Sequence, residues 1–337
     1  MKRLLTFLLI LSLAACSPKP LDNNEDPNDD TDEEPIVEET VTRSIFNGEE
    51  IEEGKNTYQA FAIMISNSAE ARPHSSLGLA DVVYEIAVET YTITRFMAIF
   101  QSEVTNKVGP VRSARIPFVR MMQEWGIPFA HFGSAATGQG DAKSLIEAIR
   151  PPIRFDGHQG INSQFFYRST DRKAPHNAYF NAERAIEKIP ELEYDKHFDF
   201  DESSNIDAQE VTSLSLRYSS YNPVSYEYDQ ETNSYKRFIK NQPMMDAYTN
   251  KQIAVRNIIV QHAPHTTAER VSYVLVDFVG EGKAEYFVGG YYEEGTWKKE
   301  SHEAVTQFFD SEGEPIVLLP GNTWIQVVHP NVGITFE

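Results

Sequence analysis

The chain has 337 residues, of which 30 are Lys or Arg and 50 are Asp or Glu, so its formal net charge is −20. This acidic excess argues against a nucleic-acid-binding protein, because such proteins need a basic face that neutralises phosphates. With 41% apolar and 12% aromatic residues, the part after residue 54 can bury the core of one large domain or two ordinary ones.

The acidic charge is unevenly distributed along the chain. Residues 17–53 contain 14 acidic and 2 basic side chains, and residues 191–337 contain 24 acidic and 11 basic ones. Residues 72–190 contain 14 basic and 11 acidic side chains. A local basic pocket is therefore compatible with the composition, and the middle of the chain is the place to look for it.

Residues 1–16 have the pattern of a lipoprotein signal peptide. Lys2 and Arg3 precede an apolar stretch at 4–13, which rises only about 15 Å as a helix and cannot span a hydrocarbon core of roughly 30 Å. The following Leu13-Ala14-Ala15-Cys16 is a lipobox, in which the single cysteine of the chain receives a lipid and is not available for a disulfide. We expect an anchor on the outer face of the cytoplasmic membrane. The alternative is an unmodified Cys16 behind an ordinary signal peptide.

Residues 17–53 are predicted to be a disordered acidic linker. Asp, Glu, Asn and Pro dominate, and there are too few large apolar side chains to offset the entropy of ordering. The run that starts at Asp26 superficially resembles a calcium loop, but it has no glycine at its sixth position and Val37 stands where a bidentate Glu belongs. We therefore predict a solvated spacer and no metal site.

Residues 54–195 are predicted to form an α+β (or α/β) N-terminal domain with a mixed sheet and flanking helices. Apolar, β-rich runs indicate strands at 61–66, 82–89, 94–101 and 127–132, of which the second and third are expected to form an antiparallel hairpin. Helices are expected at three places: from Gly109-Pro110 to Gly126 with Met121, Met122 and Trp125 turned inward, at 141–149, and from Asn181 to Ile189.

Residues 205–337 are predicted to form a β-rich C-terminal domain, with the boundary in the acidic stretch near 191–210. Apolar and polar residues alternate at Leu214, Leu216 and Tyr218, which is typical of a half-buried strand. Further strands are expected at 224–228, 255–261, 273–278, 285–289, 316–319 and 323–328.

The densest candidate site is the segment 109–115, where Gly-Pro is followed by Arg112, Ser113 and Arg115. If a helix starts there, both arginines lie on one face of its first turn, at an end that already favours anions. Two cations at that end are unfavourable unless an anion compensates them. The anion is either a ligand or an internal carboxylate at Asp81, Glu85 or Glu89, and the sequence leaves both readings open. Nearby Arg95 belongs to the same candidate set.

A second candidate site is the loop at 168–177. Its side chains suit a carboxylate, a phosphate or sugar hydroxyls, and they include Arg168, Arg172, His176 and Asn177. The alternative is a solvated surface loop. His131, at the end of the predicted strand 127–132, is a further candidate for which a purely structural role is the alternative.

Signatures of known catalytic sites are missing from the sequence. There is no nucleophile elbow, no phosphate-binding glycine loop and no thiol nucleophile once Cys16 carries a lipid. His262 and His265 have a spacing seen in metal ligands, but a proline lies between them and no third ligand is evident. We therefore predict no cofactor and no metal, and we lean against an enzyme.

Distinctive motifs lie at 71–77, 80–85, 93–101, 108–115, 175–177 and 320–325. Together they resemble a known family, the YerB-type lipoproteins of Gram-positive bacteria, over about residues 45–337. The family is defined as a domain of unknown function with its own C-terminal domain. The resemblance implies a membrane-anchored extracytoplasmic protein in two parts, and it implies no established activity or catalytic residue.

Two functions of different classes follow from the sequence. The first is a non-catalytic lipoprotein that binds an anionic envelope component, such as peptidoglycan or teichoic acid, or a cell-wall synthesis protein. The second is a cell-wall hydrolase or transferase, with His131 or His176 as general base and Arg112 or Arg115 as oxyanion stabiliser. A purely structural interaction module that uses aromatic side chains of the β-rich half is a weaker third hypothesis.

Overall fold

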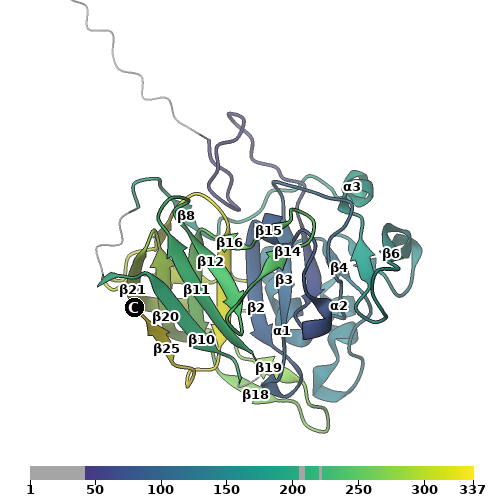
Figure 1. Ribbon diagram of the computed structural model, residues 1–337. Helices are drawn as coiled ribbons and strands as arrows, with labels where there is room; N and C mark the ends of the chain where they lie inside the picture. The colour runs from purple at the N-terminus through teal and green to yellow at the C-terminus, as the bar shows by residue number, and fades with distance from the viewer. Residues whose placement is uncertain (1–41, 205–208, 220–221) are drawn as a thin grey trace, which may run out of the picture. The chain divides into compact units, whose positions relative to one another are not determined.

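The structure is a computed structural model that describes residues 42–204, 209–219 and 222–337 (Figure 1). The predicted signal peptide, Cys16 and most of the predicted linker lie outside the described residues. The fold begins inside the segment that we predicted to be linker, because the Phe46 ring is fully buried and stacks on Trp125 at 5.4 Å. Phe46 is easily overlooked in the sequence as a core residue because the predicted linker around it is rich in acidic residues.

A mixed sheet forms the centre of the fold (Figure 1). Within the described residues it has eleven strands. Ten of them follow one another in the spatial order β22 (Gln307–Phe309), β21 (Tyr291–Lys299), β20 (Gly280–Val288), β17 (Asn257–His262), β24 (Thr323–Val328), β2 (Val82–Ala87), β3 (Thr94–Phe100), β1 (Phe61–Ser66), β4 (Phe129–His131) and β5 (Arg154–Asp156), and β9 (Gln209–Glu210) pairs with β21.

The predicted strands of the first half are present because their side chains fit a sheet that is covered on both faces. All six residues of β1 are buried, as expected for a continuous apolar run between two layers. The predicted hairpin is confirmed, since β2 and β3 pair antiparallel from Val82↔Ile99 to Ala87↔Thr94. The strands β1, β4 and β5 are parallel to one another, so their carboxyl ends meet at one edge of the sheet.

The two halves of the sequence share this sheet. Strand β24, near the C-terminus, pairs in parallel with β2 from Val82↔Thr323 to Ile86↔Val327. The fold-class prediction is confirmed: the first half contributes a mixed sheet with helices, and the second half is mostly β. The boundary near 191–210 stays a prediction, because the sheet continues across it and the described residues form a single compact unit.

The helices are α1 (Ile116–Trp125), α2 (Ala142–Ile149) and α3 (Ala182–Ala185). Gly126 ends α1 with a left-handed backbone at φ 58°, a conformation that glycine adopts without strain. The side chains of Met121, Met122 and Trp125 are buried, as predicted. Asp141 caps α2, because its Oδ1 accepts a hydrogen bond of 2.9 Å from the backbone N–H of Ser144.

The predicted start of the first helix is wrong. Arg112 and Arg115 do not share a helical turn, because the helix begins only at Ile116. The preceding segment is extended, since the N–H of Arg112 donates to the carbonyl of Met64 at 2.9 Å and that of Ala114 to the carbonyl of Gly133 at 3.0 Å. Pairing with two neighbouring segments of the sheet therefore replaces the first helical turn.

A second sheet packs on one face of the central sheet. Its six strands within the described residues are β13 (Gln242–Pro243), β12 (Ser234–Ile239), β11 (Pro223–Asp229), β10 (Ser213–Arg217) and β25 (Ile334–Phe336) in spatial order, with β16 (Ala254–Val255) paired to β12. The predicted alternation is present in β10, where Leu214 and Leu216 are buried and Ser215 and Arg217 are exposed.

Four short two-stranded pairs complete the strands of the described residues. They are β14 (Met245–Asp246) with β15 (Lys251–Gln252), β18 (His265–Thr267) with β19 (Val274–Val276), β23 (Val317–Leu318) with β8 (Asp199–Phe200), and β6 (Phe166–Arg168) with β7 (Ala178–Phe180).

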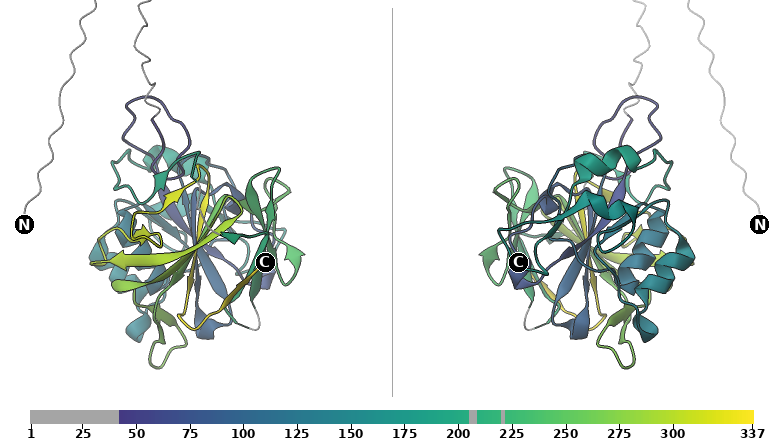
Figure 2. Two further views of the ribbon diagram at one scale, coloured as in Figure 1. Left: turned by 90° about the vertical axis from the view of Figure 1, so that its left-hand side faces the viewer. Right: turned by 90° about the vertical axis from the view of Figure 1, so that its right-hand side faces the viewer.

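The central sheet separates two hydrophobic cores. One core holds the buried side of α1 and α2, and the other holds the inner faces of β10, β11 and β12 and the buried residues of α3. Figure 2 shows the second sheet and the helices α1 and α2 on opposite sides of the central strands. In the described part of the chain, no helix has the length and apolar character needed to cross a bilayer.

Candidate functional site

A cleft of about 490 Å³ opens at the carboxyl ends of the parallel strands β4 and β5. In sheets with parallel strands and covering helices, ligands bind at this end, because the loops that follow the strands leave a crevice there. The residues that line the cleft are Val111, Arg112, Ser113, Phe132, Gly133, Ser134, Lys143, Asp156, His158, Gln159, Arg168 and Pro175.

Backbone hydrogen bonds fix the wall that carries Arg112 and Ser113. The carbonyl of Arg112 accepts from the N–H of Phe132 at 3.1 Å, and the hydroxyl of Ser113 donates to the carbonyl of Phe132 at 2.9 Å. The segment 111–114 thus lies beside the residues that follow β4 as an additional strand-like piece. Both cleft residues are therefore held by rigid backbone.

Arg112 has no partner for its guanidinium among the described residues. Its side chain is partly buried, and its Nε is buried without a hydrogen bond. Burial lowers its pKa, and the positive charges of Arg115 and Arg168 act in the same direction, while Glu89 opposes them. A buried donor without an acceptor is unfavourable, so this guanidinium is suited to an anion supplied from outside the protein.

Arg95 and Arg115 share one internal carboxylate. The Glu89 Oε1 accepts from Arg95 Nη2 at 2.7 Å and also from Arg115 Nη2. Burial, together with the charge of Arg115, lowers the pKa of Arg95 to about 9. For these two arginines the structure shows the internal ion pair, whereas the unpartnered Arg112 lines the open cleft.

The other two carboxylates that we considered as partners of the arginines, Asp81 and Glu85, bind other groups. Asp81 accepts from the N–H of Gln101 at 2.6 Å and from Ser102, and Glu85 pairs with Arg237 at 2.6 Å. Glu89 is therefore the carboxylate that balances the arginines behind the cleft, and one negative charge faces several positive ones.

Arg168, at the end of β6, contributes a second cation to the cleft. It is exposed, lies over the Phe132 ring at 4.7 Å, and donates to Asn177 Oδ1 at 2.7 Å. Asn177 in turn donates to the carbonyl of Ser169 at 3.0 Å, which ties the loop together. The predicted site residue Asn177 thus orients Arg168 and does not line the cleft itself.

Arg172 and His176 are turned toward another segment. Arg172 donates to the carbonyl oxygens of Ala71 and Pro73, so it fixes the loop to the 71–73 motif. His176 Nδ1 lies 3.2 Å from the Ser68 hydroxyl. Burial and the neighbouring charge of Arg112 lower the pKa of His176. The ring follows Pro175, which lines the cleft, but does not itself belong to the lining.

His131 is fully buried beneath the cleft. Its Nδ1 lies 2.7 Å from the carbonyl of Gly133, and its Nε2 accepts from Arg154 Nε at 3.2 Å. These partners define a neutral ring, and burial lowers its pKa to about 4. Both ring nitrogens are engaged inside the protein.

Sequence reasoning missed Lys143 and Ser134 as cleft residues. Lys143 lies on α2, between the parallel strands β4 and β5, and the rule that sites form at the carboxyl ends of such strands is the signal that could have found it. Asp156 also lines the cleft, but its carboxylate is saturated by Arg154 and by the N–H groups of Gly133 and His158. No unpaired carboxylate of a described residue lines the cleft.

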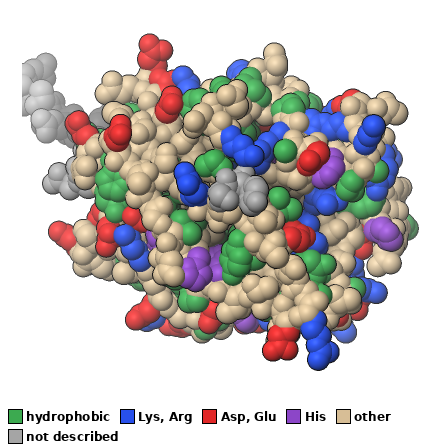
Figure 3. All heavy atoms as spheres, turned by 60° about the horizontal axis from the view of Figure 1, so that its bottom comes forward, with side chains coloured by type: hydrophobic (Ala, Val, Ile, Leu, Met, Phe, Trp, Pro, Cys, Tyr) green, Lys and Arg blue, Asp and Glu red, His purple; other side chains and the backbone are tan. Residues whose placement is uncertain are grey.

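Basic side chains also gather on one face of the molecule. Figure 3 shows Lys and Arg side chains gathered from the centre toward the right of one face, near His side chains. In the sequence, residues 105–177 contain 10 basic and 5 acidic side chains.

The fold and the cleft define a mixed-sheet α+β protein in two sequence parts, with a basic cleft in the first. The chain belongs to the family of proteins of unknown function DUF3048: the N-terminal domain of that family matches residues 46–195 and its C-terminal domain matches residues 214–325. This confirms the resemblance seen in the sequence motifs.

The chain is also similar to a curated protein and to a solved structure. The chain is 30% identical over 275 residues to the putative lipoprotein YerB of Bacillus subtilis (strain 168), which covers 79% of this chain and 80% of that protein. A crystal structure of the YerB protein from Bacillus subtilis matches with a TM-score of 0.73 and 27% identity, over 87% of this chain and 99% of that chain.

Proposed function

We propose that this protein is a lipid-anchored lipoprotein on the outer face of the cytoplasmic membrane, and that it binds an anionic cell-envelope component through the cleft around Arg112. The lipobox at Cys16 and the name of the relative, a putative lipoprotein, support the anchor. The cleft supports the binding role. Peptidoglycan, teichoic acid and an acidic surface of a wall-synthesis protein all offer the required negative charge.

The observation that carries this proposal is the unpartnered guanidinium of Arg112. The cleft contains two further cations, Arg168 and Lys143, and the carboxylate in its lining, Asp156, is fully engaged. A guanidinium that is partly buried beside other cations is unfavourable unless an anion reaches it. A ligand that carries negative charge restores this balance.

The two histidines that we predicted as general bases do not support the hydrolase or transferase alternative. The His131 ring is buried and both of its nitrogens have partners, and the His176 ring contacts Ser68 outside the cleft lining. A general base must reach the substrate proton with a free lone pair, directly or through one water. Mass spectrometry of peptidoglycan and teichoic acid after incubation with the protein separates the two: intact substrate agrees with binding, and cleaved products refute it.

The anchor is tested by replacing Cys16 with Ser. We expect the wild-type chain, expressed in a Gram-positive host, to sediment with membranes and the Cys16→Ser variant to appear in the medium, because a removed signal peptide leaves no apolar anchor. Cell fractionation and immunoblotting measure this. A variant that stays in the membrane fraction after a high-salt wash would show that another part of the chain holds the protein there.

The cleft is tested with the double variant Arg112→Ala/Arg168→Ala. We expect its affinity for isolated cell walls to fall about tenfold or more, because each charge-assisted hydrogen bond contributes about 1.5–3 kcal/mol. Pull-down with purified walls measures binding, and Arg184→Ala, which removes an exposed arginine on α3, is the matched control. Thermal unfolding should change little, because Arg112 has no partner among the described residues and the exposed Arg168 loses only its hydrogen bond to Asn177 and its contact with the Phe132 ring. Unchanged binding by the double variant contradicts the proposal.

A further inference from the structure

We propose that the cleft accepts a phosphate ester joined to a sugar or polyol, in preference to a carboxylate. This rests on the proposed function and narrows it, because peptidoglycan offers carboxylates whereas teichoic acid offers phosphates. The argument uses three properties of the cleft: its excess of positive charge, the origin of its donors and its volume.

The positive charge of the cleft exceeds what one carboxylate can neutralise. Arg112, Arg168 and Lys143 line it, and the Asp156 carboxylate among them already pairs with Arg154 at 2.9 Å. The Lys143 ammonium is weakly held, because it lies 4.0 Å from Glu147 with both side chains about half exposed, and it acts on the Asp141 carboxylate only as a nearby charge. A phosphate group places more negative charge and more acceptor oxygens at one point than a carboxylate does, so it matches this set better.

The donors come from three separate elements. Arg112 belongs to the strand-like segment 111–114, Arg168 ends β6, and Lys143 lies on α2. A planar carboxylate is satisfied by a single guanidinium fork, whereas a tetrahedral phosphate directs its oxygens to several sides. Ser134 also lines the cleft, and its hydroxyl has no hydrogen bond with a described residue, so it can donate to a ligand.

The volume indicates that the phosphate carries an organic group. A cleft of about 490 Å³ falls within the range of roughly 300–1,000 Å³ found for small-molecule sites. A lone phosphate would leave most of that space to water. The remaining lining includes His158 and Gln159, whose side chains pair well with hydroxyl groups. A sugar or polyol attached to the phosphate therefore suits the rest of the cleft.

Isothermal titration of the purified full-length chain with matched probes tests this inference. The phosphate probes are glycerol 3-phosphate and poly(glycerol phosphate), and the carboxylate probes are glycerate and polygalacturonate. We expect the phosphate probes to bind at least about tenfold more tightly than their carboxylate counterparts. Arg112→Ala and Lys143→Ala should each lower the affinity for the phosphate probes about tenfold, and the control Arg184→Ala should leave it unchanged. Tighter binding to phosphatidylglycerol vesicles than to the soluble polymer would support the same phosphate chemistry and identify a lipid headgroup as its source.

The possible failures are distinguishable. Equal binding of carboxylate and phosphate probes overturns the phosphate preference and leaves the anion-binding role intact. If the protein binds isolated walls through Arg112 but binds no phosphate probe, the phosphate preference is likewise overturned and the anion-binding role stands. If neither the walls nor any probe binds in an Arg112-dependent way, the proposed function itself fails.

Discussion

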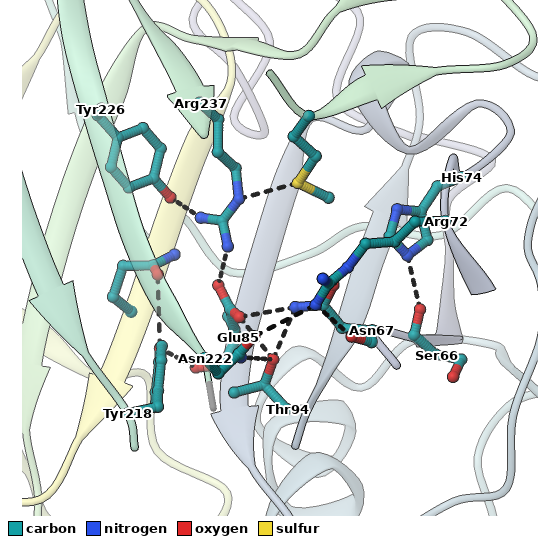
Figure 4. A network of polar contacts seen from close by, with 12 residues as sticks. Ser66, Asn67, Arg72, His74, Glu85, Thr94, Tyr218, Asn222, Tyr226 and Arg237 are labelled. Carbon is teal, nitrogen blue, oxygen red and sulfur yellow. Dashed lines mark hydrogen bonds and ion pairs between the residues drawn. The ribbon is translucent and has the colours of Figure 1, made fainter. Parts of the chain in front are cut away.

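An Arg237→Met variant is expected to lose about 3–5 kcal/mol of its free energy of unfolding, because the substitution leaves the Glu85 carboxylate buried without its cation. The two side chains are both fully inaccessible to solvent, and their nearest atoms are 2.6 Å apart (Figure 4). Glu85 lies on β2 of the central sheet and Arg237 on β12 of the second sheet. The pair therefore joins the two sheets in the interior.

The surroundings of this pair explain why its loss should be so costly. Glu85 Oε1 also accepts from Asn67 Nδ2 at 3.0 Å and from Thr94 Oγ1 at 2.6 Å, and the Arg237 guanidinium lies over the Trp324 ring at 4.8 Å. Figure 4 shows Glu85, Asn67, Thr94 and Arg237 converging between the sheets. Removing the cation disrupts a network whose remaining polar groups cannot reach water. These groups stay desolvated without the partner that compensated them, which destabilises the fold.

Urea denaturation of single and double variants measures the effect. The double variant Glu85→Gln/Arg237→Met should recover part of the stability, because no uncompensated charge remains. Arg217→Met removes an exposed arginine from β10 and should leave the free energy of unfolding within about 0.5 kcal/mol of wild type. An Arg237→Met protein as stable as wild type would refute the structural role that we assign to this pair.

The protein is expected to lose several kcal/mol of stability between about pH 6.5 and pH 4, because three buried histidines are neutral in the fold. Burial lowers the pKa from 6.5 to about 3 for His74 and to about 4 for His131 and His265. Below pH 6.5 these histidines bind protons in the unfolded chain but stay neutral in the folded protein. The contribution of these histidines to stability is thus fully present above pH 6.5. It falls as the pH drops toward their pKa values in the folded protein, by up to about 1.4 kcal/mol per pH unit for each histidine.

Denaturant titrations at a series of pH values measure this loss. The falling net negative charge acts in the opposite direction, so the comparison between variants isolates the histidines. His131→Asn should show a shallower loss on acidification than wild type, even if it is less stable at pH 7.5, and His158→Asn, which alters an exposed ring, should follow the wild-type slope. A wild-type protein equally stable at pH 7.5 and pH 4.5 would contradict the prediction.

Local elements were predictable because their signals lie within short stretches of sequence. The run 61–66 is apolar throughout and became β1, and Gly126 marked the end of α1. The start of α1 was not predictable in the same way. Arg112 and Arg115 have helical spacing, but the carbonyl that holds Arg112 belongs to Met64, and no local pattern reveals that pairing.

The cleft was predictable only in part for the same reason. Arg112, Ser113 and Arg168 were recognised by their residue types and do line the cleft. Arg95 and Arg115 belong to the same motifs, yet Glu89 neutralises them, and the sequence could not decide between Glu89 and a ligand. Lys143 was missed because a lysine on a surface helix carries no signal until the order of the strands is known.

The pairing of β24 with β2 has a consequence for how the chain reaches its fold. A chain that emerges N-terminus first holds β2 long before Thr323–Val328 arrives, and until then the buried edge of β2 lacks its neighbour. Such an edge is prone to pair with other chains, and contacts this distant in sequence form slowly. Residues after 320 thus complete a sheet that begins near residue 61, so the stretches on the two sides of the predicted boundary near 191–210 depend on each other to fold.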